Sequence, residues 1–218
     1  MVAEAPRYLV VEGPIGVGKT TLARRLAASF GSELVLEMPQ DNPFLARFYQ
    51  DRTASALPTQ LYFLFQRLEQ LRGLRQGDLF EPVRVGDYLL EKDRIFARLT
   101  LGPEELELYE KIYRQVVSDL PRPDLVVYLQ APLEVLLQRI RRRGIDYERN
   151  IDERYLQRLC NAYVRFFHDY QEAPLLIVNT ESLDLAGSDE DYRMLLERVR
   201  SMPAGRHYFN PGRLALEV

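Results

Sequence analysis

The segment from Gly13 to Thr20, Gly-Pro-Ile-Gly-Val-Gly-Lys-Thr, has the residue types and spacing of a phosphate-binding loop. Glycines let the backbone turn so that its N–H groups point at phosphate oxygens, and the ammonium of Lys19 can reach the terminal phosphates. The hydroxyl of Thr20 is a ligand that Mg²⁺ accepts. We therefore expect a nucleotide to bind at the following residues: Gly13, Pro14, Ile15, Gly16, Val17, Gly18, Lys19, Thr20 and Thr21.

Two carboxylates follow apolar runs further along the chain. Glu37 comes directly after Leu34–Leu36, and Asp87 comes after Val83–Val85 and one glycine. Because ligands of parallel α/β sheets bind beyond the carboxyl ends of the strands, both acids should face the crevice of the phosphate loop. There Glu37 could accept the proton of an acceptor hydroxyl during phosphoryl transfer, and Asp87 could bind Mg²⁺ directly or through water.

Residues 138–144, Gln-Arg-Ile-Arg-Arg-Arg-Gly, place four arginines at the end of an expected helix. Arg139 and Arg143 are four residues apart and share one face of that helix. The segment could be a solvated helix end whose cations complement the helix dipole. We favour a lid that brings Arg139 and Arg143 to the transferring phosphate as catalytic cations.

The candidate site residues follow apolar runs and helical patterns, which indicates a parallel sheet flanked by helices. Five short apolar runs are typical of strands that are buried on both faces: Tyr8–Val11, Leu34–Leu36, Val83–Val85, Leu125–Leu129 and Leu175–Val178. Helical patterns alternate with them: Thr20–Phe30, Thr59–Leu74, Pro103–Leu120, Pro132–Arg143, Glu153–Tyr170 and Asp189–Arg200. The sequence thus predicts a doubly wound α/β fold with a five-stranded sheet, forming one domain over residues 1–212. We expect residues from Pro203 onward to be irregular and residues 213–218 to form a tail.

Composition excludes several classes of protein. The formal net charge of −3 argues against a general nucleic-acid binder, which would carry a basic excess. No apolar run approaches the roughly 18 residues of a membrane span, so no membrane partner is expected. Residues 1–6 lack the pattern of a signal peptide, and the single cysteine, Cys160, cannot form an internal disulfide. We therefore expect a cytoplasmic protein.

The motif residues resemble those of the deoxynucleoside kinase family, from about Tyr8 to Leu156. The family has a P-loop like that of residues 13–20 and a strand-ending glutamate that acts as base on the nucleoside 5′-hydroxyl, which falls on Glu37. It also has a tyrosine that contacts the sugar, a glutamine eleven residues later that pairs with the base, and an arginine seven residues further on. Tyr49, Gln60 and Arg67 reproduce both spacings.

The resemblance assigns roles to further residues and has one clear departure. The family's acid-Arg-Ser motif reads Asp87-Tyr88-Leu89 here, so only the acid is shared. The resemblance implies that Asp93 pairs with Arg67, that Phe96 stacks on the nucleobase and that Glu148 contacts the sugar beside the lid.

Together these observations predict a P-loop kinase with an Arg-rich lid that phosphorylates a deoxynucleoside 5′-hydroxyl with ATP and Mg²⁺. Thr20 and Asp87 are the expected metal ligands, and purine deoxynucleosides, with deoxycytidine next, are the expected substrates. A nucleoside monophosphate kinase resembling thymidylate kinase is one alternative, and a P-loop regulatory NTPase is another. The resemblance also implies a homodimer formed through Thr59–Leu74 and Pro103–Leu120.

Overall fold

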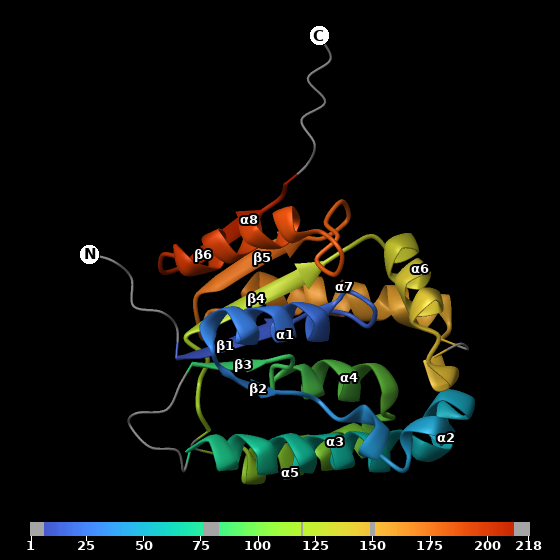
Figure 1. Cartoon of the computed structure of the whole chain (residues 1–218). Coiled ribbons are helices and arrows are strands. Elements are labelled where there is room, and N and C mark those ends of the chain that lie inside the picture. The colour runs from blue at the N-terminus through green and yellow to red at the C-terminus, as the bar shows by residue number, and fades with distance from the viewer. Residues whose placement is uncertain (1–6, 76–82, 119, 149–150, 212–218) are drawn as a thin grey trace.

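Parallel strands form the central sheet in the order β2-β3-β1-β4-β5-β6, in a computed structural model that describes residues 7–75, 83–118, 120–148 and 151–211 (Figure 1). The strand bounds are Tyr8–Glu12 (β1), Glu33–Val35 (β2), Arg84–Gly86 (β3), Leu125–Gln130 (β4), Leu175–Asn179 (β5) and Arg206–Phe209 (β6). Every residue of β1 is buried, and so are the first five of β4, as continuous apolar runs predict. This arrangement confirms the predicted α/β fold.

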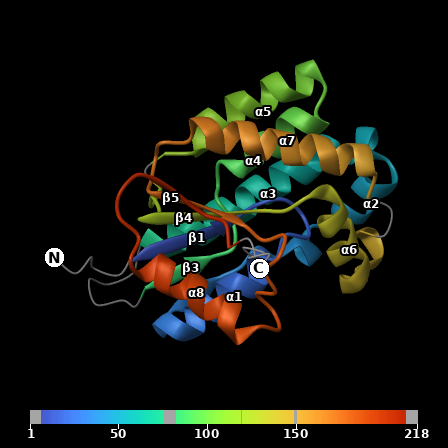
Figure 2. The same cartoon turned by 90° about the horizontal axis from the view of Figure 1, so that it is seen from above.

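Helices cover both faces of the sheet, and Figure 2 shows α1 and α8 on one side with α4, α5 and α7 on the other. Two further helices, α2 and α6, lie at the end of the sheet to which the strands point (Figure 1). The helix bounds are Lys19–Phe30 (α1), Leu45–Gln50 (α2), Arg52–Arg75 (α3), Lys92–Thr100 (α4), Pro103–Val116 (α5), Leu133–Arg143 (α6), Glu153–Asp169 (α7) and Asp189–Arg200 (α8). Short 3₁₀ turns occupy Pro39–Asp41 (η1) and Asp146–Glu148 (η2).

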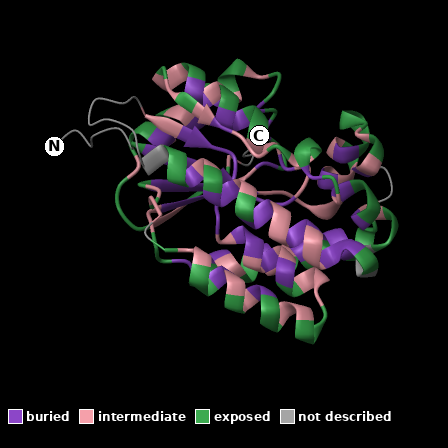
Figure 3. Ribbon diagram, turned by 90° about the horizontal axis from the view of Figure 1, so that it is seen from below, coloured by how far each residue is buried: buried purple, intermediate pink, exposed green. Residues whose placement is uncertain are grey.

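The buried side chains form stripes on the helices that face the sheet, and the outward faces are exposed (Figure 3). In α1 the stripe consists of Leu22, Ala23, Leu26 and Ala27, and the helix ends at Gly31, whose φ of +61° suits glycine. No helix within the described residues is long and apolar enough to cross a membrane.

Three predictions about the elements were wrong. The sheet has a sixth strand, β6, in the stretch expected to be irregular; this edge strand has no buried residue, so no apolar run marks it. Helix α3 begins at Arg52 and continues through Pro58, whereas the sequence suggested a start at Thr59. Helices α2 and α4 were not predicted, because each is shorter than a clear periodic pattern needs. The predicted tail at 213–218 lies outside the described residues.

Candidate active site

The phosphate loop connects β1 to α1, as predicted, and its glycines are required by close packing. Gly13 and Gly16 have φ angles of +152° and +85°, which side chains rarely tolerate. A Cβ atom at Gly13 would lie 2.4 Å from the carbonyl oxygen of Leu129 on β4. A Cβ atom at Gly16 would lie 2.7 Å from the side chain of Ile140 on α6. The loop therefore packs directly against the helix that carries the arginine-rich segment.

Lys19 begins α1 and turns back over this loop. Its Nζ atom donates hydrogen bonds to the carbonyl oxygens of Gly13 (2.8 Å) and Pro14 (3.3 Å). Burial lowers the pKa of Lys19, an effect that the nearby Glu12 carboxylate opposes. The ammonium thus lies at the loop, where it could exchange carbonyl contacts for phosphate oxygens.

Glu12, the last residue of β1, is a fully buried carboxylate that fixes the loop to its surroundings. It accepts hydrogen bonds from the backbone N–H groups of Gly13 (2.7 Å) and Leu89 (2.7 Å) and from the hydroxyl of Tyr163 (3.0 Å). Burial, followed by the charge of Glu12, raises the pKa of Tyr163, so this hydroxyl keeps its proton and remains a donor. Sequence reasoning missed Glu12, although a carboxylate that ends an otherwise apolar strand was a signal.

Asp87 lies between the phosphate loop and the segment that follows β2. Its Oδ2 atom accepts a hydrogen bond from the hydroxyl of Thr20, and its Oδ1 atom accepts one from the backbone N–H of Glu37 (2.8 Å). The two predicted metal ligands, Thr20 and Asp87, are therefore in direct contact. Within the described residues no cluster of three or more His, Cys, Asp and Glu could hold a metal ion. A Mg²⁺ ion at this pair would rely on phosphate oxygens and water for its other ligands.

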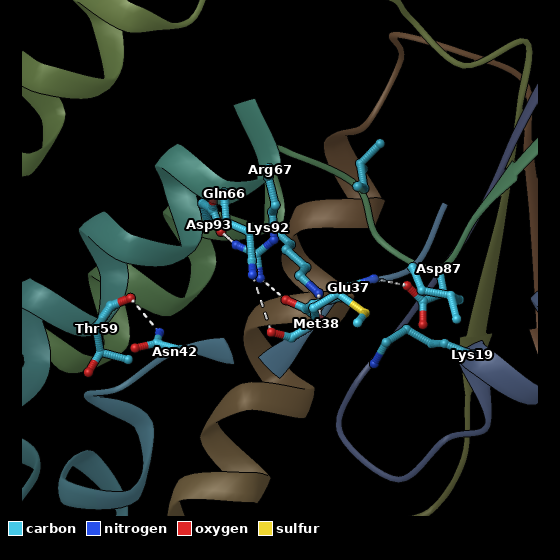
Figure 4. Close-up of polar contacts among 12 residues, drawn as sticks. Lys19, Glu37, Met38, Asn42, Thr59, Gln66, Arg67, Asp87, Lys92 and Asp93 are labelled. Atoms are coloured by element: carbon cyan, nitrogen blue, oxygen red, sulfur yellow. Dashed lines mark hydrogen bonds and ion pairs between the residues drawn. The ribbon is translucent and has the colours of Figure 1, made fainter. Parts of the chain in front are cut away.

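The carboxylate of Glu37 is held by two cations from different helices (Figure 4). Arg67 of α3 contacts Oε1, and the Nζ atom of Lys92 of α4 lies 2.7 Å from Oε2. Arg67 also forms the predicted ion pair with Asp93. Burial by itself would raise the pKa of Glu37, but Arg67 and Lys92 outweigh burial and hold it well below its usual value. Glu37 is therefore an ionised carboxylate, and the two cations that keep it ionised also lower its basicity.

Most of the predicted substrate residues surround one cavity of about 140 Å³. Its lining includes Glu37, Tyr49, Gln60, Arg67, Asp87, Phe96 and Glu148, together with Lys19, Thr20 and Arg143. We call it the acceptor cavity. Asp93 does not line it but lies behind Arg67, with its side chain 1% exposed.

Several residues that line the acceptor cavity were not predicted. Tyr147 of η2 stacks on Tyr49 with ring centroids 5.7 Å apart, and Phe63 lies on the same face of α3 as Gln60 and Arg67. The helical spacing of Phe63 from Gln60 was a signal for it. Lys92 was also missed, although the chain has lysine at only three positions, Lys19, Lys92 and Lys111.

A larger cleft of about 670 Å³ also borders the phosphate loop. We call it the donor cleft. Its lining joins residues 16–21 of the loop to three arginines of α6 and to the segment after β5, including Arg139, Arg142, Arg143, Thr180 and residues 183–186.

The two predicted lid arginines differ in their contacts. Arg139 donates to the carbonyl oxygens of Thr180 (2.7 Å), Leu183 (3.2 Å) and Val17 (3.3 Å), so its guanidinium holds the segment after β5 against the loop. Arg143 instead pairs with Glu148 and lines both the donor cleft and the acceptor cavity. Of this pair, Arg143 is therefore the better placed to reach a phosphate between the two spaces.

The chain is similar to known proteins over most of its length. Residues 9–202 match the family model described as deoxynucleoside kinase. A deoxyguanosine kinase of Bacillus subtilis is 36% identical over 204 residues, which covers 89% of this chain and 97% of that relative. A deoxyadenosine/deoxycytidine kinase of the same organism is 27% identical, covering 89% and 92% of the two chains. A solved structure of deoxyadenosine kinase from M. mycoides with dCMP and dCDP bound superposes with a TM-score of 0.79 at 24% identity, covering 89% of this chain and 99% of the other.

Proposed function

The chain belongs to the deoxynucleoside kinase family, and we propose that it transfers the γ-phosphoryl group of ATP to the 5′-hydroxyl of a purine deoxynucleoside. The observation that carries this proposal is that the donor cleft and the acceptor cavity meet at Lys19, Glu37 and Arg143. A phosphate donor in the cleft and a hydroxyl in the cavity would approach each other at this junction. Such positioning supplies much of the rate enhancement in phosphoryl transfer.

In the proposed reaction, the 5′-oxygen bonds to the γ-phosphorus while its proton passes to Glu37. The bond between the γ-phosphorus and the bridging oxygen breaks, and ADP leaves with that electron pair. Lys19 and Arg143 stabilise the negative charge on the transferring group. Arg139 would have to give up its carbonyl contacts to join them, so we assign it to holding the segment after β5 against the loop.

Mg²⁺ fits the contact between Thr20 and Asp87, because a hydroxyl and a carboxylate are both oxygen ligands of the kind it prefers. When bound, the ion neutralises phosphate charge. Asp87 would then exchange its hydrogen bond from Thr20 for a metal contact, made directly or through water. Its second oxygen would keep the backbone of Glu37 in place.

The base of the substrate would lie among Gln60, Arg67 and Phe96. Gln60 is 3% exposed and offers both a donor and an acceptor, and Phe96 offers a ring face for stacking. Arg67 lines this space and is held from behind by Asp93, and the pair suits a purine or cytosine edge better than thymine with its methyl group. The names of the relatives, deoxyguanosine kinase and deoxyadenosine/deoxycytidine kinase, support the same choice.

The alternative activities are not favoured. A nucleoside monophosphate kinase needs cations for the phosphate of its acceptor, but Arg67 and Lys92 in the acceptor cavity are already paired with carboxylates. A regulatory NTPase has no need for a second cavity that joins the phosphate site through a carboxylate.

A panel of nucleosides tests the proposal. The purified protein is incubated with ATP, Mg²⁺ and deoxyguanosine, deoxyadenosine, deoxycytidine or thymidine, and nucleoside monophosphate is quantified. We expect monophosphate from the purine deoxynucleosides. ATP hydrolysis without any monophosphate would overturn the proposal.

We also propose a homodimer through α3 and α5. Phe65 on α3 and Leu108 on α5 are 51% and 48% exposed, which is high for large apolar side chains. Light scattering after gel filtration would give the mass of two chains, and Phe65→Glu with Leu108→Glu would reduce it to that of one.

A further inference from the structure

Lys92 is a buried lysine in an unusual place. It is 3% exposed and is the first residue of α4, where the positive end of the helix dipole disfavours a cation. Lysine is almost never buried without a partner. Its partner is Glu37, whose Oε2 atom lies 2.7 Å from Nζ. A position that works against the local preference of the helix indicates a role beyond the stability of α4.

Lys92 contributes to the balance of charge around Glu37. Arg67 contacts two carboxylates, those of Glu37 and Asp93, so one cation serves two anions. Lys92 supplies the second positive charge. Without it, the partly buried carboxylate of Glu37 and the buried carboxylate of Asp93 would share one guanidinium, which is unfavourable away from bulk water.

Lys92 also determines how the carboxylate of Glu37 is oriented. Arg67 holds Oε1 from α3 and Lys92 holds Oε2 from α4, so each oxygen has its own anchor. The backbone N–H of Glu37 is bound by Asp87 on the opposite side, as Figure 4 shows. With Lys92 removed, the carboxylate could rotate about its remaining contact with Arg67.

We propose that Lys92 is a positioning residue for phosphoryl transfer, which holds the Glu37 carboxylate where it accepts the proton of the acceptor hydroxyl. This inference rests on the proposed function. It assigns to Lys92 no contact with the transferring phosphate. Replacing Lys92 should therefore act through Glu37 alone. It should lower kcat more than it weakens the binding of ATP.

A double-mutant cycle tests this role. Lys92→Met removes the charge and keeps the length of the side chain; we expect kcat to fall about 10²-fold, the usual cost of misplacing a reacting group. The KM for ATP should not change, because the phosphate loop is left intact. In a Glu37→Gln background the same change should alter kcat by no more than about twofold, the scatter of independent effects. Lys92→Arg, which keeps the charge, should recover most of the activity lost in Lys92→Met.

Lys111→Met is the matched control, because Lys111 lies on α5 with 59% of its side chain exposed. If Lys92→Met does not fold, Lys92→Gln takes its place in the cycle. Wild-type kcat in the folded variant would overturn the inference, and so would an equal loss of kcat with and without the Glu37 carboxylate. If the wild-type protein itself forms no nucleoside monophosphate, the proposed function fails first. If the wild-type protein is active and Lys92→Met matches it, only this inference fails.

Discussion

The hydroxyl of Thr20 donates a hydrogen bond to the carboxylate of Asp87, which joins the start of α1 to the end of β3. Both groups are oxygen ligands at the edge of the phosphate loop. The contact also aligns Glu37, because the other oxygen of Asp87 accepts the hydrogen bond of its backbone N–H at 2.8 Å. One carboxylate thus links the proposed metal site to the proposed general base.

Replacing Asp87 with Asn should weaken metal binding without removing the side chain. The amide keeps an oxygen for Thr20 or the ion but loses the negative charge. We expect the Mg²⁺ concentration for half-maximal rate to rise about 10- to 100-fold, as when a partner of a metal site is lost. The measurement is initial rate against Mg²⁺ at saturating ATP and nucleoside. Asp169→Asn, at the exposed end of α7, is the control, and an unchanged Mg²⁺ dependence in Asp87→Asn would exclude Asp87 from the metal site.

Lys19→Ala should abolish phosphoryl transfer and leave the fold intact. Within the described residues its ammonium donates hydrogen bonds to carbonyl oxygens of the loop alone, at 2.8 and 3.3 Å, so we expect its loss to change the unfolding temperature little. Activity assays and thermal unfolding of the variant check both parts. An unfolding temperature equal to that of the wild type together with near-normal activity would refute the proposed role.

Glu37→Gln should reduce kcat by about 10²- to 10⁴-fold, the usual value of a positioned general base. The amide fills the same space but cannot take the proton, and it leaves Arg67 and Lys92 with a neutral partner. Nucleoside binding, measured separately by calorimetry, shows whether the acceptor cavity persists. If nucleoside still binds and kcat falls less than about tenfold, Glu37 is not the base.

Sequence patterns predicted those parts of the molecule that depend on local order. Apolar runs predicted the strands β1 to β5. Fixed spacings along the chain predicted Tyr49, Gln60 and Arg67 as site residues, and the fold brings them to one cavity. What could not be predicted depends on contacts between distant elements. β6 pairs with the edge of β5, and the contact between Lys92 and Glu37 depends on where α4 lies.

The buried pair Arg67–Asp93, whose side chains are 4% and 1% exposed, should determine the choice of nucleoside. A buried polar group left without a partner by the wrong base costs about 1–3 kcal/mol. Purine deoxynucleosides should therefore have the highest kcat/KM, deoxycytidine a lower value and thymidine the lowest.

Arg67→Met tests this ranking, but Arg67 also holds the carboxylate of Glu37, so the variant should lose rate with every nucleoside. The informative quantity is the ratio of kcat/KM between deoxyguanosine and thymidine, because the loss through Glu37 is common to both and cancels. We expect this ratio to fall by about tenfold or more, which corresponds to one buried polar contact. Arg67→Met with Asp93→Asn avoids an unpaired buried carboxylate and should give the same ratio. Arg72→Met, an exposed change on the same helix, should keep the wild-type ratio. Thymidine as the best wild-type substrate, or a ratio that stays constant when Arg67 is lost, would show that this pair does not select the base.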